Sequence, residues 1–371
     1  MKNLIQDIGK KKLIIIGVIF VGIIILIIVA LLVYNAFFKT NSYASVEQIV
    51  LEAAKEYYAD NPSSLPKDLN SQITIDSTTL IAADYLKDLS DLVPDKDASC
   101  SAVVTVTYLG ISENPYRYVS KLNCGDYYTT KIFTDYIREN ESVVLSGQGL
   151  YELNGNLVYR GEDPNNNVSL GGKKWKIIKI EDGHVVLILA EKFTKVVWDD
   201  RFNVDRNQSY GINDYSVSRV YEYLTDLYDE ETLLNDSSKQ VVVPHDLYVG
   251  KRSVDINYND GSIEKSGIVS NSYIGLLPLF DYINASVDVN CASADTDSCS
   301  NYNYLVTYDY SWWTLTGDSD YSYKVYKIDN YGSIQSSRAA TSGYARPVIY
   351  LAKDAIYVSG DGTLDNPYTV K

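Results

Sequence analysis

Side chains that could act as a catalytic base are scarce in this sequence. Its 371 residues include two histidines, His184 and His245. Nucleophilic catalysis by serine or cysteine needs a base beside the nucleophile, and His184 follows an Asp-Gly pair typical of an exposed turn. His245 has Asp246 beside it, but adjacent residues on a strand point to opposite faces. We therefore predict that the protein is not an enzyme and assign no catalytic residue.

The four cysteines offer a second kind of chemistry. An even number of cysteines with wide spacing indicates disulfides and an oxidising compartment. A zinc site is the alternative, but it usually needs closer paired cysteines and more histidines. Four cysteines allow three pairings, and proximity in sequence favours Cys100 with Cys124 and Cys291 with Cys299.

Acidic residues near the C-terminus resemble the first half of a calcium-binding loop. In "DGTLD", Asp361, Thr363 and Asp365 occupy alternate positions. Such a loop is closed by a bidentate glutamate, and the sequence offers none at that position. A tight turn with local aspartate hydrogen bonds is therefore predicted. We predict no metal and no cofactor, with calcium near Asp361 and Asp365 as the alternative.

Two adjacent tryptophans are the strongest candidates for a binding platform. The segment "YDYSWWTLTGD" has strand-like character, so Trp312 and Trp313 should face opposite sides of a sheet. One ring is predicted to lie in the core and the other at the surface or in a cleft. A ligand-binding platform would combine them with Tyr308, Tyr310 and Tyr344. The alternative, in which both rings are structural, is favoured because large aromatic side chains dominate protein cores.

Charge limits the classes of partner. Lys and Arg total 33 against 48 Asp and Glu, which gives a net charge of −15. This charge repels a phosphate backbone, so we predict no nucleic-acid partner.

An apolar segment near the N-terminus predicts a membrane anchor. Residues 13–38 carry no charge, and 26 helical residues span roughly 39 Å against a hydrocarbon core of about 30 Å. A cleaved signal peptide would have a shorter apolar run. Lysines at positions 10–12 predict a cytoplasmic tail over residues 1–12. The expected location is the cell membrane, with a single span and an extracellular C-terminal part.

The next segments predict a small α+β module. "SVEQIVLEAAKEYYADNP" has the apolar spacing of an amphipathic helix that Asn61 and Pro62 end. Two interpretations of its start stay open: a capping box from Ser45 and Gln48, or one rod continuous with the apolar segment. "QITID", "CSAVVTVTYLG" and "YRYVSKL" are strand-like, and Ser77 or Thr78 would cap the short helix that follows the first.

Part of this region resembles a known family. The pieces "EQIVLEAAKEYYADNPSSLP", "ITIDSTTLIAADYLKDLSD", "CSAVVTV" and "LNCGDYYTT", in this order, are similar to type IV pilin-like and pseudopilin-like proteins. The resemblance covers roughly residues 13–130. It implies a long N-terminal helix on an antiparallel sheet and other pilin-like subunits as partners. The apolar segment lacks the glutamate that prepilins carry there.

A polar connector, residues 139–148, is predicted to lead into a second module, residues 149–371. "KWKIIKI" and "HVVLILA" flank Asp182-Gly183 as a hairpin, and "SVSRVYEYLTDLYDEETL" predicts a helix with Val217, Val220, Tyr221 and Leu224 on one face.

This module also resembles a family. The motifs "YRGEDPNNNVSLGGKKWKIIKIEDGHVVLI", "YIGLLPLFDYINAS", "WWTLTG", "ARPVIYL" and "GDGTLDNPYTV" are similar to bacterial surface domains related in fold to C-type lectins and the formylglycine-generating enzyme. Relatives carry an arginine soon after the double tryptophan, whereas Thr314, Leu315 and Thr316 stand here. The resemblance implies a C-type-lectin-like mixed α+β domain.

Taken together, these observations predict an α+β protein with five parts. They are a cytoplasmic tail (residues 1–12), a transmembrane helix (13–38), a pilin-like ectodomain (39–138), a linker (139–148) and a C-type-lectin-like distal domain (149–371). The expected function is adhesion or ligand display, with an extracellular glycan or protein as ligand. A minor pilin or pseudopilin subunit and a surface enzyme acting on glycan or peptide are the alternatives.

Overall fold

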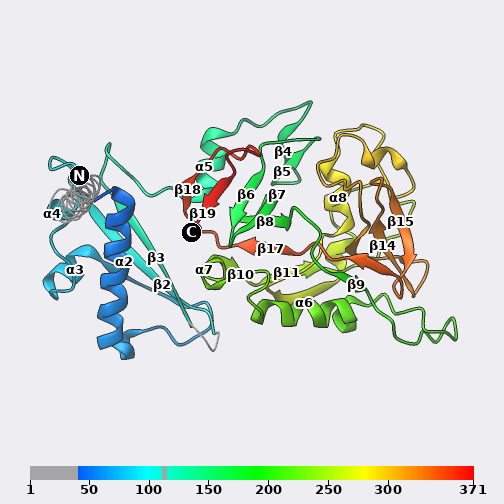
Figure 1. The fold of residues 1–371 in the computed structure, drawn as a ribbon, viewed down its shortest axis with the longest axis horizontal. Helices are drawn as coiled ribbons and strands as arrows, with labels where there is room; N and C mark the ends of the chain where they lie inside the picture. Colours follow the sequence, from blue (N-terminus) through cyan, green and yellow to red (C-terminus); the bar gives the residue numbers. More distant parts are fainter. Residues whose placement is uncertain (1–40, 111–114) are drawn as a thin grey trace, which may run out of the picture. The chain divides into compact units, whose positions relative to one another are not determined.

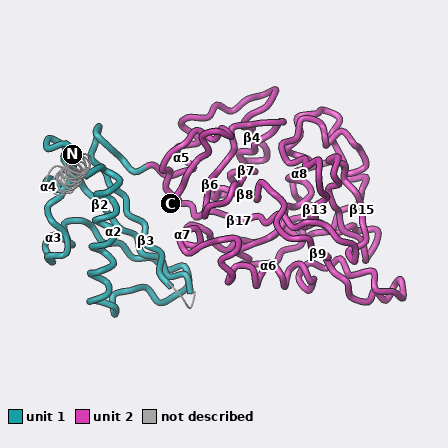
Figure 2. Tube along the Cα trace, viewed as in Figure 1, with its two compact units in different colours: residues 1–130 teal, residues 131–371 magenta. Residues whose placement is uncertain are grey.

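The computed structural model describes residues 41–110 and 115–371 (Figure 1). The chain divides into two compact units, Met1–Thr130 and Lys131–Lys371 (Figure 2). This boundary falls earlier than the predicted linker, residues 139–148. Helix α5 (Phe133–Asn140) belongs to unit 2 because Phe133 and Ile137 are buried and the Phe133 backbone N–H donates to the carbonyl of Ala355 at 2.8 Å.

Unit 1 is a long helix packed on a small antiparallel sheet. Helix α2 (Tyr43–Asp60) places Val46, Val50 and Ala54 in the same core as Val104 and Leu122 of the sheet. The strand order is β1-β2-β3, with both pairs antiparallel. The remaining elements of this unit are η1 (Pro62–Ser64), β1 (Gln72–Asp76), α3 (Ser77–Ala82), α4 (Leu89–Leu92), β2 (Ser101–Tyr108) and β3 (Tyr116–Asn123). The predicted helix and three strands are all present.

The caps of the two helices differ from those predicted. Ser42, in an extended conformation, is the N-cap of α2, and its hydroxyl accepts the backbone N–H of Ser45 at 3.2 Å. Ser45 is therefore not the capping residue, and the extended Ser42 rules out a rod continuous through this point. Helix α3 is capped by Asp76, one residue before the predicted caps, and its carboxylate accepts the Thr79 N–H at 2.7 Å.

The membrane-spanning part of the predicted fold class is corrected. The described residues form a mixed α+β structure with more strand (32%) than helix (22%). Within residues 41–110 and 115–371, no helix is both long enough and apolar enough to cross a membrane. The transmembrane architecture and the single-pass membrane location predicted from the sequence are thus contradicted for the residues that the structure describes. The segment on which that prediction rested, residues 13–38, lies outside the described residues.

Unit 2 contains a large sheet with nine strands. Its main path is β10-β17-β8-β7-β6-β19-β18, and β5 pairs with both β7 and β4. The strands are β4 (Gly149–Leu153), β5 (Asn156–Arg160), β6 (Asn167–Leu170), β7 (Lys173–Glu181), β8 (His184–Leu189), β10 (Val242–Val243), β17 (Val348–Leu351), β18 (Tyr357–Ser359) and β19 (Tyr368–Val370). The predicted hairpin is β7–β8. Asp182 and Gly183 adopt the positive φ angles of its turn, 51° and 83°.

Unit 2 also contains a five-stranded sheet with the order β15-β14-β13-β16-β9. Its strands are β9 (Lys195–Val197), β13 (Trp312–Gly317), β14 (Lys324–Ile328), β15 (Ile334–Arg338) and β16 (Ser342–Tyr344), and β11 (His245–Tyr248) pairs with β12 (Ile268–Ser272). Helix α8 (Leu279–Ala285) contacts both β13 and β5, so it joins the two larger sheets.

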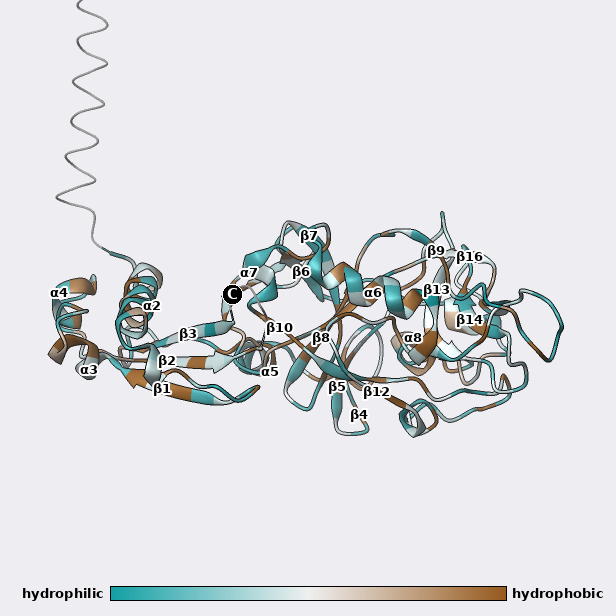
Figure 3. Ribbon diagram, turned by 90° about the horizontal axis from the view of Figure 1, so that it is seen from below, coloured by the Kyte–Doolittle hydropathy of each residue, from teal (hydrophilic) through white to brown (hydrophobic). Residues whose placement is uncertain are grey.

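Helix α6 (Arg219–Asp229) has the predicted amphipathic character, and both polar and apolar residues are visible along it in Figure 3. It buries Val220 and Leu224 as predicted. Val217 is 47% exposed, because it belongs to the short 3-10 turn η2 (Tyr215–Val217) rather than to the helix. The other short elements are α7 (Asp236–Lys239), η3 (Glu264–Ser266) and η4 (Asp297–Ser300).

Candidate functional site

Both tryptophans of the predicted platform are completely buried, with 0% of each side chain exposed. They do point to opposite faces of β13. Trp312 meets Tyr282 of α8 edge to face, with ring centroids 5.8 Å apart, whereas the indole N–H of Trp313 donates to the carbonyl of Val196 at 3.3 Å. The expectation that one ring reaches the surface is wrong, and the favoured alternative, in which both rings are structural, is confirmed, because β13 is an inner strand covered on both faces.

A buried arginine, Arg346, contacts the Trp312 ring. The Arg346 guanidinium lies 4.8 Å from the Trp312 ring centroid. It donates to the carbonyls of Leu189 and Leu305 at 3.2 and 2.9 Å. Burial lowers the Arg346 pKa, but a guanidinium remains charged in proteins. Arg346 was not singled out from the sequence, although it belongs to the motif "ARPVIYL".

Two of the three predicted tyrosines lie side by side near the start of β13. Tyr310 and Tyr344 meet edge to face with centroids 5.3 Å apart, and the Lys192 ammonium lies 5.4 and 5.5 Å from the two centroids. Lys192 also pairs with Asp309 at 3.1 Å. We call Lys192, Asp309, Tyr310 and Tyr344 the tyrosine–lysine cluster. Tyr308, two residues before Tyr310, is 76% exposed.

The tyrosine–lysine cluster presents charged groups at the surface, where a ligand could contact them. The hydrogen bond from Lys192 to Asp309 raises the lysine pKa, so the ammonium is charged at neutral pH. Burial raises the Tyr310 pKa, and its hydroxyl has no hydrogen-bond partner among the described residues. An exposed ammonium and carboxylate therefore lie beside the partly exposed Tyr344 ring, while the Tyr310 ring and its unpaired hydroxyl are buried behind them. Lys192 and Asp309 were missed in the sequence because 117 positions separate them.

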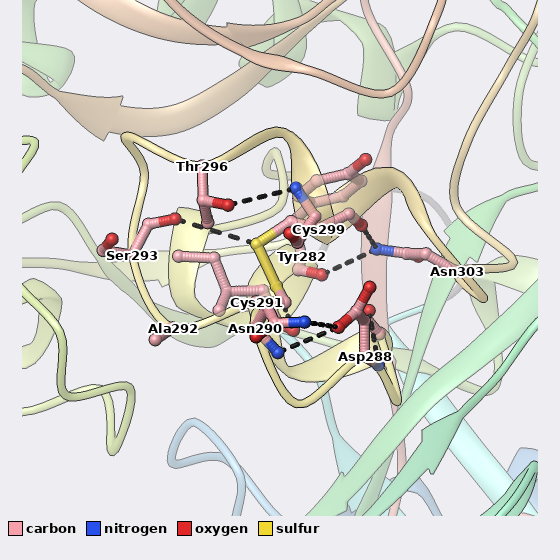
Figure 4. The surroundings of a disulfide bond; sticks show 12 residues. Tyr282, Asp288, Asn290, Cys291, Ala292, Ser293, Thr296, Cys299 and Asn303 are labelled. Carbon is pink, nitrogen blue, oxygen red and sulfur yellow. Dashed lines mark hydrogen bonds between the residues drawn. A yellow bond between two sulfur atoms is a disulfide. The ribbon is translucent and has the colours of Figure 1, made fainter.

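The second predicted disulfide, Cys291–Cys299, closes a loop that is hydrogen-bonded to α8 through Asn303. The predicted pairings, Cys100–Cys124 and Cys291–Cys299, are both confirmed. Figure 4 shows how Asn303 ties the Cys291–Cys299 loop to α8: its side-chain amide donates to the carbonyls of Tyr282 and Cys299 at 3.0 and 2.9 Å. The loop is thus anchored to the helix that also contacts Trp312.

The two histidines lie side by side, which sequence analysis missed. Their ring centroids are 5.3 Å apart, and the His245 ring stacks on Tyr350 at 3.9 Å. The His184 Nδ1 is 2.7 Å from the carbonyl oxygen of Leu351. Burial and the neighbouring His184 lower the His245 pKa. Both contacts to β17 depend on the pairing order of the large sheet, which no local sequence signal reveals.

A buried ion network lies between the large sheet and α8. The Lys179 ammonium pairs with the carboxylates of Glu181 and Asp281 at 3.1 and 3.0 Å, and all three side chains are at most 3% exposed. Lys265 contacts the second oxygen of Glu181 at 3.1 Å. The Lys179 ammonium also lies 4.8 Å from the Phe280 ring centroid. Because Lys179, Glu181 and Asp281 are closed to solvent, we interpret the network as structural.

The network predicts a pH-dependent contribution to stability. Burial raises the Asp281 pKa from 3.8 to about 6. Between these values the folded chain binds this proton more readily than the unfolded chain, so this group alone makes the protein less stable as pH rises from about 4 to about 6. Replacing Asp281 by asparagine should remove this contribution. Urea unfolding of both proteins at several pH values tests this: an unchanged difference in unfolding free energy across pH 4–6 contradicts it.

The predicted turn near the C-terminus is present. The Asp361 carboxylate accepts the backbone N–H and the hydroxyl of Thr363 at 3.1 and 2.7 Å, and these bonds lower the Asp361 pKa. In residues 41–110 and 115–371, no group of three or more histidine, cysteine, aspartate or glutamate side chains is arranged to hold a metal ion.

Comparisons with known proteins do not assign this chain to a family. No protein-family model matches it, and neither a curated protein nor a solved structure does. The fold and the site therefore define a two-unit α+β protein with two disulfides, and function has to be argued from the geometry alone.

Proposed function

We propose that unit 2 is a binding module that contacts its ligand through the tyrosine–lysine cluster and Tyr308. The observation that carries this proposal is the position of the Lys192 ammonium over both the Tyr310 and Tyr344 rings, beside an exposed carboxylate. Tyrosine suits such a surface because it supplies a large amphipathic contact area with little conformational entropy to lose. The fully buried Trp312 pairs in register with Tyr344, so the core strand β13 holds one member of the cluster in place.

A neutral glycan is the ligand class that best fits this surface. Aromatic rings pack against the C–H face of a sugar, and an ammonium, a carboxylate and a phenol provide donors and acceptors for its hydroxyls. The net charge of −15 disfavours polyanionic glycans and nucleic acids. The two disulfides support a place of action in an oxidising compartment. A protein ligand is the other outcome that the experiment below distinguishes.

A binding screen with matched variants tests the proposal. The full-length chain is applied to an array of neutral glycans, acidic glycans and proteins, and the affinity of each hit is then measured. Tyr308→Ala should leave folding intact, because the ring is 76% exposed, and should weaken binding by about 1–3 kcal/mol. Tyr331→Ala removes a ring that is 70% exposed in the β14–β15 turn and serves as the control.

Two results would overturn this function. One is a glycan or protein hit whose affinity is unchanged by both Tyr308→Ala and Lys192→Gln. The other is turnover of an array compound, which would favour the enzyme alternative.

Unit 1 supports a second candidate, a subunit of an ordered assembly. A shallow groove of about 480 Å³ runs along the exposed side of α2, lined by Gln48, Ile49, Glu52 and Tyr85 among others. A long helix on an antiparallel sheet with an open groove on the helix is suited to packing against another subunit. Concentration-dependent polymerisation of the chain would favour this candidate over ligand binding alone.

A further inference from the structure

Unit 2 also contains a cleft that shares no residue with the tyrosine–lysine cluster. Its volume is about 260 Å³, and it lies between the segment that follows α5 and the segments that form β4 and the end of β5. The residues of its lining that matter here are Glu141, Val144, Leu150, Tyr159, Pro164 and Asn165. This size suits one side chain or one small molecule.

The walls of the cleft are fixed without any ligand. The Gln148 side chain exchanges two hydrogen bonds with the backbone of Asp163, at 3.1 and 3.3 Å, which ties the two walls together. The backbone N–H of Val144 donates to the carbonyl of Leu150 at 2.8 Å. At Gly161 a Cβ atom would lie 2.2 Å from the Cβ of Gln148, so this close approach needs glycine. A preformed cleft binds without a cost of ordering its walls.

Two polar groups in the cleft have unused hydrogen-bonding capacity. The Tyr368 hydroxyl donates to Oε1 of Glu141 at 3.0 Å, and Oε2 accepts no hydrogen bond from the described residues. Tyr159 is 1% exposed, and its hydroxyl has no hydrogen-bond partner of regular geometry in the described part of the chain. A buried hydroxyl without a partner is costly, so a ligand that satisfies it gains affinity.

The charge of the cleft is negative. Burial raises the Glu141 pKa, and the nearby Asp361 carboxylate raises it further. None of the described residues that line the cleft is a lysine or an arginine. A partly desolvated carboxylate without a cation favours a ligand that brings the positive charge.

We propose that this cleft binds a primary ammonium group on an apolar stem, such as a lysine side chain of a partner or a free alkylamine. The ammonium contacts Oε2 of Glu141 and the Tyr159 hydroxyl, while the stem packs against Val144, Leu150 and Pro164. An ammonium suits a carboxylate with one free oxygen, because it is a compact charge with three donors. A guanidinium is less suited, since its best geometry engages both carboxylate oxygens.

Isothermal titration of the full-length chain with two amines tests this site. The probes are Nα-acetyl-lysine methylamide and 1-aminopentane, with the corresponding norleucine amide and glucose as controls. We expect saturable binding of at least one amine and of neither control. Glu141→Gln should weaken that binding by about tenfold or more. Glu139→Gln is the matched variant. Glu139 lies two residues before Glu141, in the last turn of α5, and its exposed carboxylate pairs with Lys131 at 3.2 Å, so binding should not change.

Tyr159→Phe keeps the test valid if Glu141→Gln does not fold, since the hydroxyl it removes makes no hydrogen bond of regular geometry with the described residues. This variant should weaken amine binding several-fold and leave the melting temperature unchanged. Binding should also weaken as pH falls through the Glu141 pKa.

If only the lysine amide binds, the ammonium that this cleft recognises comes from a lysine side chain of a protein partner. If 1-aminopentane binds equally well, a free amine suffices. No saturable amine binding, or equal binding by wild type, Glu141→Gln and Tyr159→Phe, would overturn the proposal.

Discussion

Replacing either Trp312 or Trp313 by alanine is expected to destabilise unit 2 by about 3–5 kcal/mol. Each ring is completely buried, so its loss removes apolar burial and leaves a cavity. The two cavities differ in their surroundings. Loss of the Trp312 ring leaves a cavity between Tyr282 and Arg346. Loss of the Trp313 ring leaves a cavity beside the backbone of Val196 and beside Gly343. The Trp313 ring packs so closely on Gly343 that a Cβ atom there would lie 2.8 Å from the indole nitrogen. Neither cavity can collapse without moving a neighbouring strand or helix.

Urea unfolding of each tryptophan variant in the full-length chain measures this loss. Tyr331→Ala, which removes an exposed ring from the same sheet, should change the unfolding free energy by less than about 0.5 kcal/mol. A loss below about 1 kcal/mol for one tryptophan would show that its ring does not belong to the core. The ligand-binding platform, which the sequence left open as the less favoured interpretation, would then have to be considered again.

Replacing Lys179 by methionine is expected to cost about 3–5 kcal/mol as well, for an electrostatic reason. The substitution removes the only cation that contacts Asp281 in the described structure and one of the two that contact Glu181. Asp281 then stays in the interior without a partner charge. Lys174→Met, at an exposed position of the same strand, is the control and should have little effect.

A second substitution shows whether the charge or the packing of Lys179 matters. In Lys179→Met combined with Asp281→Asn, no uncompensated aspartate remains, so part of the lost stability should return. If the double variant is as unstable as the sum of the two single variants, the lysine contributes through packing. The ion network would then not explain its burial.

Features governed by short stretches of sequence were predictable. The turn at Asp182-Gly183, the antiparallel sheet of unit 1 and both disulfide pairings follow from local periodicity, turn residues and proximity of cysteines. Cap positions were off by one to three residues, because several neighbouring serine, threonine and aspartate side chains can each satisfy the first turn of a helix.

The burial of both tryptophans agrees with the interpretation favoured from the sequence, but the segments that cover each ring could not be predicted, because they are distant in the chain. Alternation along β13 does separate the rings, but whether each face is covered is decided by α8, Arg346 and β9. The histidine pair and the Lys179 network have the same origin. Each joins residues that lie far apart in the chain and meet through the fold of unit 2.

Hydroxyl-radical footprinting of the full-length chain with its array ligand tests the central claim most directly. The claim is that the ligand contacts the tyrosine–lysine cluster rather than the buried tryptophans. Oxidation of Tyr308 and Tyr344 should fall when the ligand is bound, that of the exposed control Tyr331 should not change, and Trp312 and Trp313 should stay unoxidised in both states. Unchanged oxidation of Tyr308 and Tyr344 at a saturating ligand concentration would contradict the claim.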